Sequence, residues 1–315
     1  MVAAIERGVR DRFGTPRAGE LWIGDDAAVV QAPPGALVLA ADAALAGVHA
    51  DLSLVSLGDL GWKAMAAAIS DIGAMGARPL HALVTIGVPG GVDVAEIVSG
   101  VLDAGREWGC TVVGGDLTRA DQALVSVAVT GALDEPDGAP VTRAGAVAGD
   151  AVLVTGPLGA SAAGLRLLQA GAGGRPEEAL PQGPEGVAGN LLAAHRRPRA
   201  RVAEGRAARL GGASAMIDVS DGLSIDLERL AVASGVGIAL VGVPVAPGAT
   251  EEEALGGGED FELVIATGDP DRLLGQFARA GLRPPLPIGT CTADPSVRTL
   301  RGRPLPLTGW QHELG

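Results

Sequence analysis

Short apolar segments alternate with segments of helical periodicity along the chain, and this alternation limits the possible folds more than any other feature. In the first half, apolar runs typical of strands occupy residues 36–41, 80–88, 111–113 and 123–133, with helical patterns at 56–76 and 93–108. Such alternation is typical of α/β proteins. Residues 134–149 then gather Pro, Gly and Asp-Gly turn signals, and the alternation begins again at residue 151. We therefore expect two α/β domains, at 1–148 and 149–315.

The second half also alternates expected strands and helices, with different spacing. Strands are expected at 151–155, 213–217, 237–241, 261–266 and 287–291, and helices at 160–170, 187–195, 198–210, 223–234 and about 270–280. Residues 171–186 are rich in Gly, Pro and Glu, which favours an exposed loop. Local signals mark helix ends: Ser56 with Asp59 resembles a capping box, and Gly109 and Gly235 stand where helices end.

Composition narrows the possible functions. The chain has 315 residues, of which 47% are hydrophobic, and a net charge of −13. The acidic balance disfavours nucleic acid as a partner, because its phosphates would be repelled. The longest apolar runs are too short to span a membrane, and the N-terminus lacks a signal-peptide pattern. Cys110 and Cys291 lie far apart without metal-ligand spacing. We expect a cytoplasmic protein with two buried, reduced thiols.

The common phosphate-binding motifs are missing. The chain contains neither Gly-x-x-x-x-Gly-Lys-Ser/Thr nor a Gly-x-Gly-x-x-Gly between a strand and a helix. Lys63 is the only lysine, and its helical context indicates a structural residue. Any phosphate site must therefore rely on other groups.

Aspartates near Gly or Ser are the main chemical feature. They are Asp25 and Asp26 after Gly24, Asp42 after an apolar run, Asp71 among small apolar residues, Asp116 after Gly114-Gly115, and Asp218 and Asp221 around Val219-Ser220. Mg²⁺ prefers oxygen ligands, usually one or two carboxylates with water and phosphate oxygens. Glycine lets backbone amides approach a phosphate closely. Singly, such an aspartate is more often a turn or helix-cap residue. The residues alone thus favour acidic turns that can hold Mg²⁺.

Seven segments, taken in order, resemble the thiamine-monophosphate kinase family. They are Trp22–Val30, Ala41-Asp42 with Gly47-Val48-His49, Leu60–Ala77, Gly114–Arg119, Gly149-Asp150 with Val154–Leu165, Met216–Leu223 and Gly257–Leu263. The resemblance runs from residue 22 to about 265, with a further match in the tail at Gly309–His312. Each segment is weak alone, but their common order is specific.

The resemblance implies an AIR synthetase-like (PurM-like) fold, with mixed sheets in two α/β domains and a homodimer joined through the N-terminal sheets. It implies direct in-line transfer from ATP to thiamine phosphate, giving thiamine diphosphate, without a covalent intermediate. By motif position, several Mg²⁺ ions would be held by Asp26, Asp42, Asp71, Asp116, Asp218 and Asp221, with help from Asp25. ATP would meet Gly115, Asp116, Arg143 and Ser220, and thiamine phosphate would meet His49, Glu259 and Trp310.

The chain departs from the family's motifs at two places, and other proteins of the superfamily remain alternatives. Ala40-Ala41 stands where the family often has a hydroxyl residue before Asp42, and Leu117 replaces a common Thr. Neither change removes a carboxylate, so activity is still expected. Other ATP-using enzymes of the superfamily are AIR synthetase, selenophosphate synthetase and a hydrogenase-maturation dehydratase. The last two normally carry a reactive cysteine near one end, and this chain shows none before Cys110 or in its last residues. A non-catalytic nucleotide-binding relative would be expected to lack several aspartates.

Overall fold

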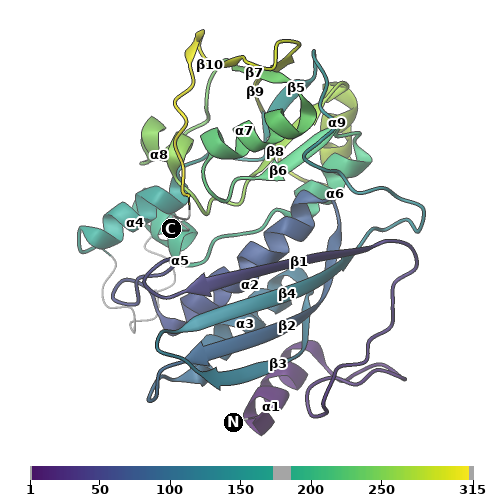
Figure 1. The fold of residues 1–315 in the computed structure, drawn as a ribbon, viewed down its shortest axis with the longest axis vertical. Coiled ribbons are helices and arrows are strands. Elements are labelled where there is room, and N and C mark those ends of the chain that lie inside the picture. Colours follow the sequence, from purple (N-terminus) through teal and green to yellow (C-terminus); the bar gives the residue numbers. More distant parts are fainter. Residues whose placement is uncertain (1, 173–185, 312–315) are drawn as a thin grey trace. The chain divides into compact units, whose positions relative to one another are not determined.

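The computed structural model describes residues 2–172 and 186–311. They divide into two compact units (Figure 1). The N-terminal unit holds residues 2–72 and 78–139, and the C-terminal unit holds 73–77, 140–172 and 186–311. Both units combine helices with a mixed sheet, which confirms the predicted fold class. Within these residues we find no helix whose length and apolar character would allow it to cross a membrane.

The N-terminal unit is a mixed sheet with helices on one face. Its elements are α1 (Val2–Phe13), β1 (Leu37–Leu45), α2 (Leu57–Ala74), β2 (Arg78–Val88), α3 (Val94–Trp108), β3 (Thr111–Arg119) and β4 (Leu124–Ala132). The strand order is β1-β4-β2-β3, with β2 and β3 parallel and the other pairs antiparallel. Figure 1 shows α2 and α3 behind this sheet.

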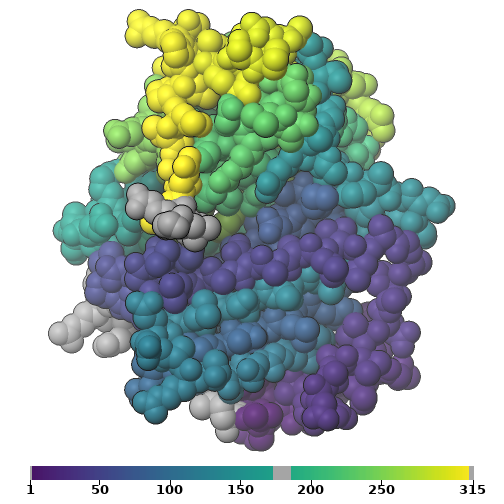
Figure 2. All heavy atoms as spheres, in the orientation of Figure 1, coloured from purple at the N-terminus to yellow at the C-terminus, as the bar shows by residue number. Residues whose placement is uncertain are grey.

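Side chains alternate between the two faces of this sheet, as the pleat requires. Val127 of β4 pairs with Val84 of β2, and both are buried. Their neighbours Ala128 and Leu83 also pair but are exposed, as is Leu39 of β1 at 68%. Figure 2 shows the strands of this second face at the visible surface. One face therefore builds the core, and the other, which we call the open face, does not.

The C-terminal unit is built around a larger mixed sheet. Its elements are β5 (Ala151–Val154), α4 (Ala160–Gln169), α5 (Val187–Arg196), α6 (Val202–Leu210), β6 (Ala215–Asp218), α7 (Leu223–Ser234), β7 (Gly237–Leu240), α8 (Glu251–Gly256), β8 (Leu263–Thr267), α9 (Pro270–Arg279), β9 (Leu286–Thr292), β10 (Arg298–Leu300) and β11 (Arg303–Pro304). The strand order is β11-β10-β7-β9-β5-β8-β6. Ile217, Leu227 and Ile288 pack in its main apolar core.

Three predicted helix-end signals are confirmed. The amide of Asp59 donates to Ser56 Oγ at 3.0 Å, and the Ser56 amide donates to Asp59 Oδ2 at 3.2 Å, which completes a capping box. Gly109 and Gly235 end α3 and α7 with φ of 67° and 68°. These left-handed angles favour glycine because it lacks a Cβ.

Three predicted boundaries were wrong. β1 does not end at Asp42 but continues to Leu45, because β4 pairs with it along this whole length. β3 does not break at Gly114 but continues beside β2 to Arg119. The helix predicted from residue 198 begins at Val202. For the two strands, pairing with a neighbouring strand overrides the local signal. The helices α1 and α8 and the strands β10 and β11 were not predicted. The loop predicted at 171–186 lies almost entirely outside the described residues.

Candidate functional site

Asp25 and Asp26 share a pocket with Gly115. The pocket has a volume of about 790 Å³ and lies between the segment 22–28 and residues of β2 and β3, including Thr85 and Gly115. Both aspartates are exposed, and the Asp26 amide donates to Asp25 Oδ1 at 2.8 Å. Two adjacent carboxylates therefore face a solvent-accessible space whose wall also contains glycine backbone. This arrangement suits a cation with phosphate oxygens.

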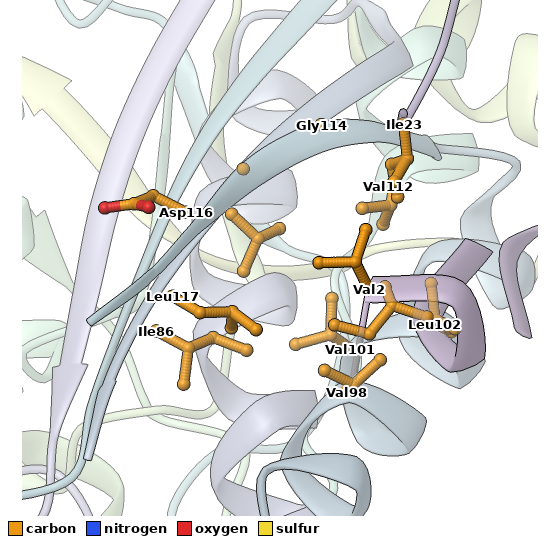
Figure 3. Close-up of a pocket in the computed structure, with 13 residues that line it drawn as sticks. Val2, Ile23, Ile86, Val98, Val101, Leu102, Val112, Gly114, Asp116 and Leu117 are labelled. Atoms are coloured by element: carbon orange, nitrogen blue, oxygen red, sulfur yellow. The ribbon is translucent and has the colours of Figure 1, made fainter. Parts of the chain in front are cut away.

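Gly115 has no room for a side chain. A Cβ at this position would stand 1.9 Å from the Val84 carbonyl oxygen of the neighbouring strand. Asp116 follows directly and pairs with Thr85. An aliphatic cavity of about 270 Å³ lies beside this strand, lined largely by α1, α3 and β2. Figure 3 shows the Asp116 carboxylate pointing away from the aliphatic side chains of that cavity. The Asp116 carboxylate therefore does not enter the aliphatic part of this cavity.

Asp42 lies in the same cross-strand row as Gly115 but at the opposite edge of the sheet. The row runs from Asp42 through Val127 and Val84 to Gly115. Three strand spacings separate the backbones of its ends by about 14 Å. The Asp42 carboxylate accepts the Ala43 amide at 2.7 Å. Within one chain, therefore, Asp42 and Gly115 do not share one wall of a small pocket.

His49 and Asp71 occupy the turn after β1 and the last turn of α2. His49 Nδ1 accepts the Leu45 amide at 3.1 Å, so the neutral ring carries its proton on Nε2. Asp71 is half-buried near the negative end of the α2 dipole, an unfavourable place for a carboxylate. Its neighbour Ile72 contacts Gly131, which pairs with Val38 of β1, four residues before Asp42.

In the C-terminal unit, Asp218 and Asp221 flank the end of β6 and the start of α7. Asp218 is 2% exposed, whereas Asp221 is half-buried. The amides of Ser220 and Asp221 donate to Asp226 Oδ2 at 3.1 and 3.0 Å. Arg229 Nη1 donates to Asp221 Oδ2 at 2.5 Å and to Asp226 Oδ1 at 2.6 Å. The carboxylates of Asp221 and Asp226 thus share one guanidinium.

Electrostatics in this cluster favour a further positive charge. Burial raises the pKa of the Asp226 carboxyl to about 6, and the charges of Asp218 and Asp221 also raise it. The amide of Asp221 and the Arg229 guanidinium act in the opposite direction. The single arginine therefore does not fully compensate the carboxylates.

The segment from Gly257 to Leu263 places two residues, one of them an acid, in unusual backbone conformations. Glu259 and Phe261 have φ of 63° and 50°, which non-glycine residues seldom adopt and which often marks functional sites. Glu259 Oε2 lies 4.0 Å from Nδ1 of the buried His195. His195 Nδ1 also lies 3.3 Å from Ser161 Oγ. The predicted substrate residue Glu259 therefore sits beside a buried histidine.

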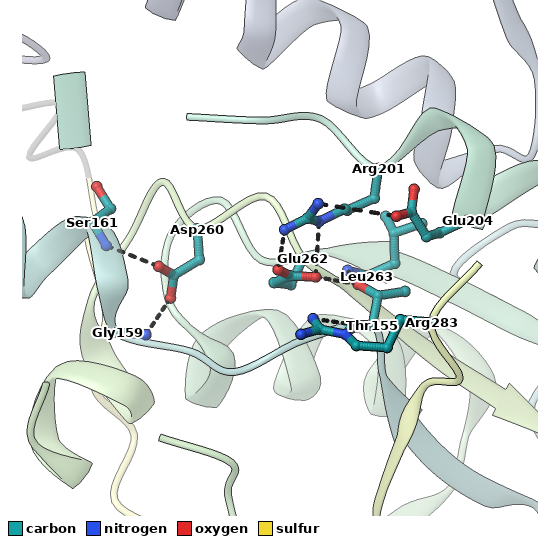
Figure 4. Close-up of polar contacts among 9 residues, drawn as sticks. All are labelled: Thr155, Gly159, Ser161, Arg201, Glu204, Asp260, Glu262, Leu263 and Arg283. Atoms are coloured by element: carbon teal, nitrogen blue, oxygen red, sulfur yellow. Dashed lines mark hydrogen bonds and ion pairs between the residues drawn. The ribbon is translucent and has the colours of Figure 1, made fainter. Parts of the chain in front are cut away.

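Asp260 and Glu262 turn inward from this segment (Figure 4). Asp260 accepts the amides of Gly159 and Ser161 at 2.5 and 3.1 Å, at the start of α4. Burial raises its pKa to about 6. Arg201 donates to both carboxylate oxygens of Glu262, at 3.0 and 2.6 Å. These contacts fix the backbone on both sides of Phe261.

Arg143 and Trp310 lie at different places around α7. The Arg143 carbonyl accepts Ser234 Oγ at 2.9 Å, near the C-terminal end of the helix. The Trp310 amide donates to the Asp221 carbonyl at 2.8 Å, near the N-terminal end. The Trp310 side chain is 49% exposed. The structure thus brings the Trp310 backbone to Asp221, while the Arg143 backbone is one helix length away.

The carboxylates are dispersed rather than gathered into a protein-only metal cage. In residues 2–172 and 186–311, no group of three or more His, Cys, Asp or Glu is arranged to hold a metal ion. Mg²⁺ commonly retains water and binds through one or two carboxylates plus substrate phosphates. The donor set present, pairs of carboxylates beside glycine backbone, fits that mode of binding.

Several of these residues were not predicted. Asp226, Arg229, Asp260, Glu262 and Arg201 have no role in the sequence interpretation. Two signals were available: Asp226 is an acid in the first turn of a helix directly after Ser-Asp-Gly, and Glu262 lies within the apolar run that leads into β8. A buried acid requires hydrogen bonds or a cation.

Comparison with known proteins places the chain in a family. The N-terminal and C-terminal domain models of AIR synthase related proteins match residues 24–133 and 147–300. The chain is 37% identical over 257 residues to thiamine-monophosphate kinase of Bacillus subtilis, which covers 78% of this chain and 76% of that protein.

Two solved structures are also similar. One is thiamine-monophosphate kinase from Stenotrophomonas maltophilia, with a TM-score of 0.82, 32% identity and 96% coverage of both chains. The other is AaThiL complexed with AMPPCP and TMP, with a TM-score of 0.75, 30% identity and coverage of 92% and 91%. The order of acidic motifs, the two-unit mixed α/β fold and these similarities together show that the chain belongs to the thiamine-monophosphate kinase family.

Proposed function

We propose that this protein transfers the γ-phosphoryl group of ATP to thiamine phosphate, giving thiamine diphosphate and ADP. The observation that carries the proposal is the pocket in which Asp25 and Asp26 face the glycine backbone at Gly115, in a member of this kinase family. AaThiL, at 30% identity, was solved with AMPPCP, an ATP analogue, and with TMP. This pocket provides carboxylates and close backbone access, which a phosphate-transferring site requires.

Joining two phosphate chains needs positive charge at the site, because both substrates are polyanions. Mg²⁺ held by carboxylates of this chain would supply that charge. The residues proposed to hold it are Asp26, Asp42, Asp71, Asp116, Asp218 and Asp221, assisted by Asp25. Their carboxylates are the oxygen donors that Mg²⁺ prefers.

The chain's own residues would bind and orient the two substrates. We assign ATP to Gly115, Asp116, Arg143 and Ser220. Thiamine phosphate is assigned to His49, Glu259 and Trp310, whose indole could stack on a cationic or aromatic ring. Transfer would be direct. Support for this comes from the cysteines: burial raises the pKa of Cys110 far above its ordinary range and that of Cys291 to about 11, so neither is an activated nucleophile.

We also propose a homodimer joined through the open face of the N-terminal sheet. Leu39 and Leu83 are 68% and 49% exposed on this face, with exposed Ala128 between their strands. Exposed leucines on one face of a sheet favour burial against a second copy. Light scattering should give twice the chain mass of 31.3 kDa. Leu39→Asp should give monomers, and Val241→Asp, at a 74% exposed position of the C-terminal unit, should not. A monomeric wild type would contradict this proposal.

We assign the protein to the cytoplasm. Both cysteines are free and buried, as expected where thiols stay reduced. ATP is also available there.

The catalytic proposal is tested by incubating the purified chain with ATP, MgCl₂ and thiamine phosphate. Chromatography should show thiamine diphosphate. Aminoimidazole ribotide or selenophosphate production without thiamine diphosphate would contradict the proposal and favour another enzyme of the superfamily.

Asp71 provides a sharper test of the proposed metal site. Asp71→Asn should abolish turnover while circular dichroism stays unchanged, because one ligand oxygen loses its charge. Asp11→Asn, at an exposed position of α1, is the matched control and should retain wild-type turnover. Near wild-type kinetics in Asp71→Asn would remove Asp71 from the metal site.

A further inference from the structure

The loop that carries Asp221 is held from inside helix α7 by a buried carboxylate. Asp226, which is 0% exposed, accepts the amides of Ser220, Asp221 and Gly222 with one oxygen, Oδ2, at 3.1, 3.0 and 3.2 Å. Three successive amides that converge on one oxygen form a nest of the kind that binds anions. Here the anion is the protein's own carboxylate, so in this conformation these amides are already engaged.

Arg229 connects the same carboxylate to the side chain of Asp221. Its Nη1 atom donates to Asp226 Oδ1 at 2.6 Å and to Asp221 Oδ2 at 2.5 Å. The loop carbonyls are also bonded: that of Ser220 accepts the Glu259 amide and that of Asp221 accepts the Trp310 amide, both at 2.8 Å. Backbone and side chain of Asp221 are thus fixed by separate contacts.

Helix capping alone does not require this arrangement. A Ser, Thr, Asp or Asn at the N-cap would satisfy the first amides of α7 locally. The N-cap residue is instead Gly222, with φ of 125° and no side-chain cap bond. Asp226 is buried close to the acids Asp218 and Asp221, whose charges oppose its own. Burying a third carboxylate there has an electrostatic cost, which the hydrogen bonds from the loop amides and from Arg229 oppose.

We propose that Asp226 and Arg229 are positioning residues for Asp221: Asp226 fixes the loop backbone, and Arg229 sets the direction of the Asp221 carboxylate. This inference rests on the proposed function, in which Asp221 holds a divalent cation. Residues that orient metal ligands typically change metal affinity or activity by about 10–100-fold when they are replaced.

The test compares Arg229→Met with Arg298→Met. Arg298 Nε donates to Glu228 on the same helix α7 at 2.5 Å, so its replacement also breaks an α7 ion pair but leaves the loop of residues 220–222 untouched. We would measure kcat, the KM values and binding of Mn²⁺ in the presence of ADP by electron paramagnetic resonance. Arg229→Met should lower kcat and Mn²⁺ affinity by about 10–100-fold. Arg298→Met should keep both near wild-type values.

Asp226→Asn is the second variant, because Asn keeps the shape but loses the charge that holds Arg229. Hydrogen exchange at the amides of residues 220–222 should accelerate in this variant and stay slow in the wild type. Wild-type Mn²⁺ affinity and exchange rates in both loop variants would overturn the inference. Equal losses in Arg229→Met and Arg298→Met would also overturn it, since they would reflect general stability. If the wild type binds Mn²⁺ with ADP but does not phosphorylate thiamine phosphate, the proposed function fails while the positioning test still stands.

Discussion

Replacing Gly115 with alanine tests the close approach of β3 to β2 at the proposed phosphate site. The added Cβ would stand 1.9 Å from the Val84 carbonyl oxygen, whereas ordinary contact begins at 3.4 Å. The two strands would have to separate by about 1.5 Å at a point where their usual spacing is about 4.8 Å. The obstacle is backbone, which cannot rotate aside as a side chain can. Overpacking of this kind costs about 3 kcal/mol.

The assay is thermal unfolding together with turnover of thiamine phosphate. A loss of about 3 kcal/mol corresponds to a fall in Tm of roughly 6–12 °C for a domain of this size. Turnover should also fall, because Gly115 lines the same pocket as Asp25 and Asp26. Gly275→Ala is the control: it lies within α9 with no atom within 4 Å of the added Cβ, so it should stabilise by up to about 1 kcal/mol. A Gly115→Ala protein with wild-type Tm and turnover would show that β2 and β3 tolerate a side chain at this position.

Three further predictions concern buried groups. Asp260→Asn removes a carboxyl whose pKa is about 6 in the folded protein and 3.8 ordinarily. Because the folded state holds this proton more tightly than the unfolded state, the free energy of unfolding of the wild type should fall by up to about 3 kcal/mol relative to the variant between roughly pH 3 and pH 7. The same pH dependence of the unfolding free energy in both proteins, measured with denaturant, would contradict this. Arg201→Met leaves the Glu262 carboxylate buried without its ion-pair partner, at 5% exposure, and should lower the free energy of unfolding in urea by about 3–5 kcal/mol. Arg301→Met, which breaks an exposed ion pair, should lower it by less than about 1 kcal/mol. Equal losses in the two variants would argue against burial as the cause. Cys110 should react with a thiol reagent only as fast as the protein unfolds, because burial raises its pKa, and rapid labelling of the native protein would disagree.

Local signals in the sequence were sufficient where the structure is set by neighbouring residues. The capping box of Ser56 with Asp59, and the left-handed Gly109 and Gly235, depend only on a few adjacent positions, and all were predicted. Alternating apolar segments likewise predicted the α/β class of both units.

Features that depend on distant partners could not be obtained in this way. Asp42 and Gly114 resemble strand-ending residues, but β4 and β2 supply hydrogen bonds that carry β1 and β3 past them. The same limit applies to buried charge: Glu262 is bonded to Arg201, 61 residues away, and Asp260 to Gly159, 101 residues away. Sequence alone shows such acids without showing their partners.

The candidate site shows the same difference between features that local residues determine and features that distant partners determine. The aspartates were identified from their context, and the structure brings Asp25, Asp26 and Gly115 to one pocket. It leaves Asp42 at the other edge of the same sheet. Asp226 and Arg229, which hold Asp221, became visible only through their contacts.

We propose that the phosphoryl group passes directly from ATP to thiamine phosphate. The most direct measurement follows ATP labelled at the γ-phosphate in a single turnover with Mg²⁺ and thiamine phosphate. We predict that the label moves into thiamine diphosphate in equal amount to the ADP formed, with none retained on the protein. Label bound to the protein or released as inorganic phosphate, without labelled thiamine diphosphate, would contradict the account.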